Sequence, residues 1–146
     1  MNNKFFALFA LLFYSFCFFF SSQAHAEIPE ELEIFLQKSD TTNLYWKLDE
    51  DPGFPGGESA FREYFVENLS YPVASQQNGV QGKVFVLFII EKDGTFSAVQ
   101  ATNKYDGNLE KAAVELVRNM PKWNPGKVKG DIVRSLMILP VNFTLE

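Results

Sequence analysis

The sequence of 146 residues has little of the two side chains on which most structural metal sites and many nucleophilic mechanisms depend. It contains one cysteine and one histidine, Cys17 and His25, and both fall within its first 26 residues. Beyond them no disulfide, Ser-His-Asp triad or Cys/His metal site can form. The acids at 49–51 also lack the alternating ligands of a calcium loop. We therefore predict no enzymatic activity, no metal and no other cofactor.

Clusters of basic side chains are scarce as well. The chain carries 18 acidic and 13 basic residues, and its longest basic cluster is Lys127-Val128-Lys129, which argues against a nucleic-acid partner. The charge is uneven, because residues 27–67 hold 11 acidic and 3 basic side chains whereas residues 68–146 hold 7 and 9. Proline and glycine accumulate at 51–57, where neither helix nor strand can continue. We expect an acidic leader over residues 27–52 and one domain over residues 53–146.

The one long hydrophobic run lies at the N-terminus. It extends without charge from Phe5 to Phe20 and is followed by Ala24-His25-Ala26, a small-x-small cleavage pattern. Its 16 residues fall short of the roughly 20 that a membrane-spanning helix needs. We expect residues 1–26 to be a signal peptide, with Ala24, Ala26 and Glu27 forming the cleavage site. An uncleaved membrane anchor is the alternative.

Hydrophobic spacing in the domain predicts a helix, a β-hairpin, a second helix and a final strand. The expected segments are a helix at 58–69 with a short helical piece at 72–77, strands at 82–91 and 95–103 around the Asp93-Gly94 turn, a helix that Asn108 caps and Pro121 ends, and a strand at 132–145. This order predicts an α+β fold. We expect a small antiparallel sheet, made of the hairpin and a C-terminal edge strand, with helices packed on one face.

Two features of the expected sheet bear on function. The strand at 82–91 is apolar on both faces, so its second face needs a cover: the leader, a second copy of the chain or a partner. Pro140 cannot donate a ladder hydrogen bond, which favours an edge position for the last strand. Such an edge exposes backbone groups to which an extended peptide can add. Tyr45 and Trp46 of the leader are candidates either to cover the domain or to recognise a partner.

Several short motifs follow one another in a fixed order beyond residue 54. They are Tyr71-Pro72, GVQGKVFV at 79–86, Asp93-Gly94, MPKWNPG at 120–126 and LPVNF at 139–143. Together they resemble the C-terminal domain of TonB-type energy transducers, over about Phe54 to Glu146. The segments FPGGE at 54–58 and NLSYP at 68–72 are similar to the variant common in the Bacteroidota.

The resemblance implies a protein partner for the last strand, because in that family this strand pairs with a short N-terminal segment of outer-membrane receptors. The implied partner-binding residues are Val133, Arg134, Ser135, Leu136, Met137, Ile138, Leu139, Val141, Asn142, Phe143 and Thr144. Structural roles are expected for Tyr71, Pro72, Gly82, Asp93, Gly94, Pro121, Trp123, Pro125 and Pro140.

The chain departs from an energy transducer in two respects: its hydrophobic segment looks cleavable, and no proline-rich spacer precedes the domain. Two hypotheses remain. The protein is a periplasmic module that binds extended segments of outer-membrane receptors or transporters in TonB-dependent transmembrane transport, or it is a structural or assembly component of the Gram-negative cell envelope that uses the domain to dimerise or dock. An uncleaved N-terminus would add a contact with the inner membrane. The course of the leader along the last strand distinguishes the two hypotheses.

Overall fold

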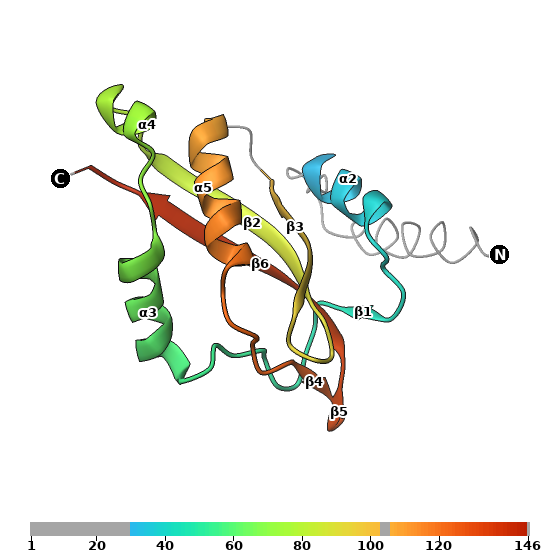
Figure 1. Ribbon diagram of the computed structural model, residues 1–146. Coiled ribbons are helices and arrows are strands. Elements are labelled where there is room, and N and C mark those ends of the chain that lie inside the picture. Colours follow the sequence, from blue (N-terminus) through green and yellow to red (C-terminus); the bar gives the residue numbers. More distant parts are fainter. Residues whose placement is uncertain (1–29, 103–105, 146) are drawn as a thin grey trace, which may run out of the picture.

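The computed structural model describes residues 30–102 and 106–145 (Figure 1). The predicted cleavage site at Ala24, Ala26 and Glu27 lies outside these ranges. The elements are α2 (Glu30–Lys38), β1 (Leu44–Tyr45), α3 (Gly57–Asn68), α4 (Val73–Gln77), β2 (Gly82–Ile90), β3 (Phe96–Ala101), α5 (Gly107–Arg118), β4 (Lys127–Val128), β5 (Asp131–Ile132) and β6 (Arg134–Phe143). Within the described ranges, no helix is long and apolar enough to cross a membrane.

The main sheet has four strands in the order β1-β6-β2-β3. β6 is antiparallel to β2 along its whole length, from Gly82 opposite Phe143 to Ile90 opposite Ser135, and β3 completes the predicted hairpin on the other side of β2. The two-residue β1 pairs in parallel with the start of β6, so the sheet is mixed. The α+β class predicted from the sequence is confirmed, and the parallel β1 is an addition to it.

One face of the sheet carries the main hydrophobic core. Side chains at alternate positions of β2, among them Val84, Val86 and Phe88, pack against the buried stripe of α5, which includes Leu109 and Leu116. Helix α3 joins the same cluster through its half-buried aromatic side chains. The continuous apolar run of β2 and the period of 3.6 in α5 are the patterns that the sequence displays, which is why both elements form where they were expected.

Trp123, in the segment after α5, closes this core at one end. It is 8% exposed, and its ring meets those of Phe54, Phe61, Phe88 and Phe96 edge-on, with centroids 5.7 to 6.1 Å apart. Edge-to-face pairs of this kind are each worth about 0.5–1.5 kcal/mol beyond the area that they bury. The tryptophan thereby joins the hairpin, α3 and the loop before α3 into one cluster.

The leader covers part of the second face. Phe35 of α2 is 1% exposed and packs against Leu87 and Ile89, with Leu44 and Leu136 at the margin of the cluster. Because side chains alternate along a strand, α2 lies on the face opposite α3 and α5. The prediction of helices on one face therefore holds for α3 and α5, and α2 adds a helix on the other. The sequence left three possible covers for this face: the leader, a second copy of the chain or a partner. In the described residues, the leader covers part of it.

The start of α5 differs from the prediction by two residues. Its N-cap is Asp106, not Asn108, and the Asp106 carboxylate accepts hydrogen bonds from the Asn108 N–H at 2.8 Å and from the Ser75 hydroxyl at 3.0 Å. Both residues are good caps by type, but the carboxylate is charged, which suits the positive end of the helix dipole. The bond to the buried Ser75 also ties α5 to α4, a tertiary contact that the local sequence does not reveal.

Candidate functional site

The candidate site is the outer edge of β6, defined as the side of Leu136 to Asn142 that faces away from β2. At its head, Arg134 and Ser135 pair with Leu44 and Tyr45 of β1. Beyond Ser135, no strand among residues 30–102 and 106–145 pairs with this side of β6 (Figure 1). The leader thus pairs with the first two residues of the strand and engages the N–H of Leu136, and it leaves the edge from the Leu136 carbonyl onward without a β-neighbour in the described structure.

The hydrogen bonds of the hairpin fix which backbone groups this edge presents. Thr102 N–H donates to the Phe85 carbonyl at 2.9 Å, so the backbone groups of Phe85 point toward β3. Pro140 lies opposite Phe85 and Ile138 opposite Leu87. Along an antiparallel strand the backbone hydrogen bonds point alternately to the neighbour on either side. The β2 residues that bond to β3 therefore do not bond to β6, and the β6 residues opposite them turn their N–H and carbonyl groups away from β2.

The parallel pairing of Tyr45 with Ser135 uses the outward groups on either side of Ser135, among them the Leu136 N–H. The outer edge therefore presents the N–H groups of Ile138 and Asn142, together with the carbonyls of Leu136, Ile138, Pro140 and Asn142. Two donors and four acceptors remain along the edge, because β1 takes the donor of Leu136 and Pro140 has none. The backbone of residue 140 points away from β2, so the ladder between β6 and β2 needs no N–H at this position. The ten-residue strand therefore accommodates a proline there without losing a hydrogen bond to β2.

The side chains along the edge are uncharged. No Asp, Glu, Lys or Arg occurs from Leu136 to Thr144. Leu136, Ile138, Pro140 and Asn142 lie on the face of α2, and Ile138 is 55% exposed there, while Met137, Leu139 and Val141 lie on the face of the main core. An uncharged edge with an exposed isoleucine is a surface on which another strand can be added.

Arg134 fastens the leader to the head of the edge. Its Nε and Nη2 donate to Glu91 Oε2 and Oε1 at 2.7 and 2.9 Å, and its Nη1 donates to the Thr42 carbonyl at 2.8 Å and lies 3.3 Å from Asp40 Oδ2. The bidentate bond from Arg134 lowers the pKa of Glu91 and Glu91 in turn raises the pKa of Arg134. One guanidinium thus joins the end of β2, the start of β6 and the chain that leads into β1.

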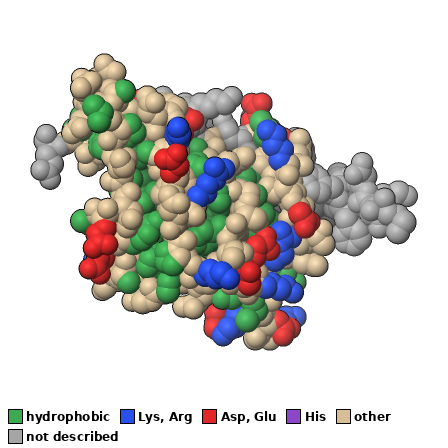
Figure 2. Space-filling view, in the orientation of Figure 1, with side chains coloured by type: hydrophobic (Ala, Val, Ile, Leu, Met, Phe, Trp, Pro, Cys, Tyr) green, Lys and Arg blue, Asp and Glu red, His purple; other side chains and the backbone are tan. Residues whose placement is uncertain are grey.

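Further polar contacts continue along the leader toward β4. Asp49 Oδ2 accepts from the Lys129 N–H at 2.6 Å, and Lys127 Nζ donates to Glu50 Oε2 at 2.8 Å. Figure 2 shows acidic and basic side chains intermixed around β4 and β5, whereas hydrophobic side chains gather between α3 and α5. The acidic leader therefore lies against basic residues of the domain, in keeping with the charge asymmetry of the sequence.

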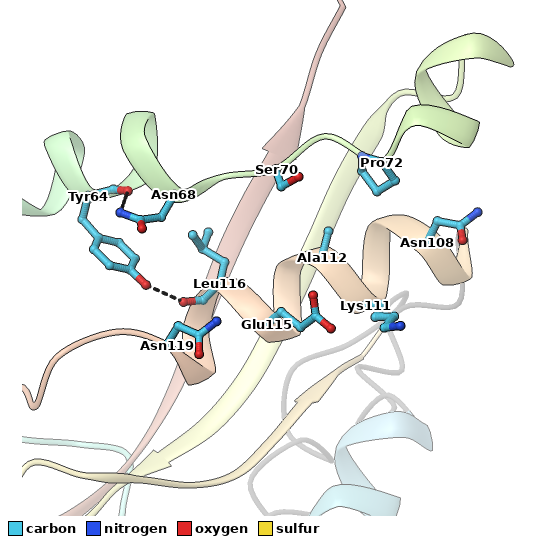
Figure 3. Close-up of a pocket in the computed structure, with 10 residues that line it drawn as sticks. All are labelled: Tyr64, Asn68, Ser70, Pro72, Asn108, Lys111, Ala112, Glu115, Leu116 and Asn119. Atoms are coloured by element: carbon cyan, nitrogen blue, oxygen red, sulfur yellow. Dashed lines mark hydrogen bonds between the residues drawn. The ribbon is translucent and has the colours of Figure 1, made fainter.

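A second feature considered is an open groove of about 420 Å³ between α3 and α5. Figure 3 shows Tyr64 and Asn68 on its α3 side, where the Tyr64 hydroxyl donates to the Leu116 carbonyl at 3.0 Å and Asn68 Nδ2 to the Tyr64 carbonyl at 2.8 Å. These polar groups serve to hold helix backbones. Among the described residues there is also no group of three or more metal-ligating side chains. The groove carries no chemistry that competes with the edge as a site.

The predicted partner-binding residues fall into three groups. Val133 is buried just before β6, Arg134 and Ser135 are paired with β1, and the residues from Leu136 to Phe143 form the rest of β6, with Thr144 just beyond it. Sequence reasoning missed Glu91, Asp40 and Thr42, the partners of Arg134. Glu91 can be identified as a partner only from the register. Ile90 lies opposite Ser135, so Glu91, which follows Ile90, comes beside Arg134, which precedes Ser135.

The residues expected to be structural lie at junctions between elements. The Tyr71 hydroxyl donates to the Val80 carbonyl at 2.5 Å and its ring meets Phe143 edge-on, and Pro72 is the N-cap of α4. Gly82 begins β2, Pro121 and Pro125 flank Trp123, and Pro140 faces outward from β6. Asp93 accepts from the Thr95 N–H at 3.0 Å, within the turn that places Gly94 against Trp123.

Comparison with known proteins bears on the whole domain. The family model of the Gram-negative bacterial TonB protein C-terminal matches residues 67–145. Similar solved structures include the NMR structure of the Helicobacter pylori TonB C-terminal domain, with 18% identity and a TM-score of 0.46 over 86% of this chain and 98% of that one. Another is the Pseudomonas aeruginosa TonB C-terminal domain, with 26% identity and a TM-score of 0.37 over 53% and 78%. No curated protein sequence matches the chain significantly.

The family match spans more than half of the chain and contains α4, α5 and every strand except β1. It includes the whole of β6 and therefore the candidate edge. The chain belongs to the family of Gram-negative TonB C-terminal domains, periplasmic and non-enzymatic parts of energy transducers.

Proposed function

We propose that this protein is a TonB-like periplasmic interaction module that binds extended segments of outer-membrane receptors or transporters in TonB-dependent transmembrane transport. Binding occurs by addition of the segment as a strand to the outer edge of β6. The observation that supports the proposal is the row of outward groups from the Leu136 carbonyl to Asn142, beyond the end of β1, beside which the described residues provide no strand. Main-chain hydrogen bonds of this kind supply affinity, and neighbouring side chains supply specificity.

The substitution Ile138→Pro tests the proposal, because it removes an outward N–H while leaving the bonds between β6 and β2 in place. The full chain would be titrated with synthetic peptides of about ten residues, copied from the N-terminal periplasmic segments of outer-membrane receptors encoded in the same genome. Loss of one edge donor leaves a peptide carbonyl unpaired, at a cost of about 1 kcal/mol or more, so we expect affinity to fall about 5-fold or more.

Ile138→Ala is the matched control, since it trims the same side chain but keeps the N–H. A larger loss in Ile138→Pro than in Ile138→Ala, with both variants folded by circular dichroism, supports strand addition at this edge. Unchanged peptide affinity in a folded Ile138→Pro variant contradicts it.

The second candidate function is a structural or assembly role in which the domain dimerises or docks in an envelope complex. The pairing of β1 with the head of β6 favours it, because the leader already takes two positions of the strand. Sedimentation of the full chain over a wide concentration range distinguishes the two. A dimer that Ile138→Pro dissociates, in a protein that binds none of the receptor peptides, would favour assembly.

We also propose that residues 1–26 are removed on export and that the chain is free in the periplasm. Support comes from the length of the hydrophobic run and from the Ala24-His25-Ala26 pattern. Cell fractionation and intact mass test this. A soluble product that begins at Glu27 supports release, and a membrane-bound product that retains Met1 supports an anchored protein.

A further inference from the structure

The row of groups on the outer edge of β6 also restricts the sequence of the strand that can pair with it. Every second residue of an added strand turns its N–H toward β6, and the residues between turn theirs away. Four carbonyls on the edge, those of Leu136, Ile138, Pro140 and Asn142, call for donors from the partner. A proline in the partner that faces β6 would leave one of these carbonyls unpaired, whereas a proline that faces away would cost no hydrogen bond.

We propose that the partner of this edge is an uncharged extended segment in which prolines stand only at positions of one parity, the parity that faces away from β6. The inference rests on the proposed function and names the class of segment that the edge selects. Two prolines separated by an even number of positions are compatible with binding. Two prolines separated by an odd number are not, because one of them must face β6 in whatever register the segment docks.

The length of the segment is limited as well. Tyr45 of β1 lies beside Ser135, so an added strand cannot extend past Leu136 without displacing the leader. At the other end β6 stops at Phe143. The edge therefore accommodates about eight residues, which span about 26 Å at the usual rise of a strand.

The chemistry of the partner's side chains follows from the two faces of β6. On the α2 face an added residue lies beside the exposed Ile138 and beside Pro140. On the core face it lies beside Met137 and Leu139, which pack on the main cluster. Because β6 has no charge from Leu136 onward, a charged side chain at the centre of the segment would lose solvent and gain no counterion from this strand.

The test uses tethered segments, so that it does not depend on a receptor. An eight-residue segment of alternating valine and threonine is fused to the C-terminus of the full chain through a flexible Gly/Ser linker of about 20 residues, which lets it lie along β6 in either direction. Three versions are compared: without proline, with prolines two positions apart, and with prolines three positions apart. The two proline versions have closely matched composition, so a difference in the amide protection that they give reports the effect of proline spacing.

The measurement is amide hydrogen exchange at Ile138 and Asn142, the two outward amides that β1 does not engage. We expect these amides to be protected by the segment without proline and by the segment with even spacing, and protection to fall about 5-fold or more with odd spacing. Equal protection by the two proline versions would overturn the inference, and so would failure of the proline-free segment to protect either of the two amides.

The two proposals can fail separately. If the parity rule holds but no receptor peptide binds, then the edge selects such segments and the proposed receptor partner is wrong. If receptor peptides bind in a way that Ile138→Pro weakens, yet both spacings are tolerated, then strand addition stands and the restriction on proline is wrong.

Discussion

Gly94 and Trp123 are held together through their backbones. Trp123 N–H donates to the Gly94 carbonyl at 3.0 Å, and a Cβ atom added to Gly94 would lie 2.0 Å from the Trp123 carbonyl oxygen. Gly94 also has a φ of 82°, in the left-handed region that favours glycine. The Asp93-Gly94 turn and the segment around Trp123 are distant in the sequence, and this contact gives a physical reason for the two motifs to occur together.

The substitution Gly94→Ala should destabilise the protein, because the methyl group meets main-chain atoms that cannot move independently and the backbone angle is unfavourable. We expect a loss of about 2–4 kcal/mol in the free energy of unfolding, measured by urea denaturation. Gly107→Ala is the matched control, since no heavy atom lies within 4 Å of the position that its Cβ would take. Equal stability of the two variants would contradict this account of the contact.

Replacement of Arg134 by methionine should loosen the leader. The variant leaves the Glu91 carboxylate without its bidentate partner and frees the Thr42 carbonyl, so we expect a loss of about 1.5–3 kcal/mol. Amide exchange of α2 and β1 should rise. Lys127→Met breaks the more exposed pair with Glu50 and should cost less than about 1 kcal/mol. A larger effect at Lys127 than at Arg134 would show that the leader is held elsewhere.

The stability of the protein should fall in acid partly through Glu91. Hydrogen bonding from Arg134 holds the pKa of Glu91 below its ordinary value of 4.5, so the group contributes stability above that pH, and the contribution is lost as the pH falls through the folded-state pKa. Glu91→Gln should therefore show a shallower loss of stability below pH 4.5 than the native chain.

Asp40, Asp93 and Asp106 also have lowered pKa values, from hydrogen bonds to Thr42, Thr95 and Asn108 respectively. Their protonation in acid destabilises the native chain and the Glu91→Gln variant alike. The difference between the two stability curves therefore reports the contribution of Glu91. Parallel curves would rule out a contribution from the Glu91–Arg134 pair.

Removal of the Phe35 ring should uncover the second face of the sheet. Phe35→Ala deletes a fully buried side chain that packs on Leu87 and Ile89, and we expect a loss of about 3–5 kcal/mol with increased binding of a hydrophobic dye. Ile34→Ala, at a more exposed position of the same helix, should change stability by less than about 0.5 kcal/mol. Similar losses in both variants would show that α2 does not cover this face.

The direction of the backbone groups in β6 can be measured without a partner. In the full chain, the amides of Met137, Leu139 and Val141 should exchange slowly because they bond to β2, while those of Ile138 and Asn142 should exchange faster. Fast exchange at the odd-numbered positions instead would invert the assignment of the edge.

The sequence predicted most of the elements because their patterns are local. The continuous apolar run at 84–90 predicts a strand, the Asp93-Gly94 turn predicts a hairpin, and the apolar stripe of α5 predicts a helix, each without reference to the rest of the chain. The alternation along β6 is equally local, and the buried side chains at Ser135, Val141 and Phe143 follow it.

What the sequence did not predict depends on contacts between distant segments. The parallel pairing of Leu44 with Arg134 has no local signal, because two residues are too few for a pattern. The Asp106 cap of α5 also accepts a hydrogen bond from Ser75 of another helix, a contact that no local pattern reveals. The site was predicted as a strand, but which of its backbone groups face outward follows only from the register between Phe85 and Pro140.

The position of β6 in the sheet also governs when the protein can fold. β6 follows every other element in the sequence, yet it lies between β1 and β2, and it joins residues as distant as Leu44 and Arg134. Contacts of such long range slow folding, because the chain must close large loops before they form. During synthesis or passage through a membrane channel, the apolar strand β2 therefore lacks its principal neighbour until Phe143 has emerged. Truncation of the chain before Leu139 would therefore leave the first half of β2, Gly82 to Val86, without a neighbour on that side.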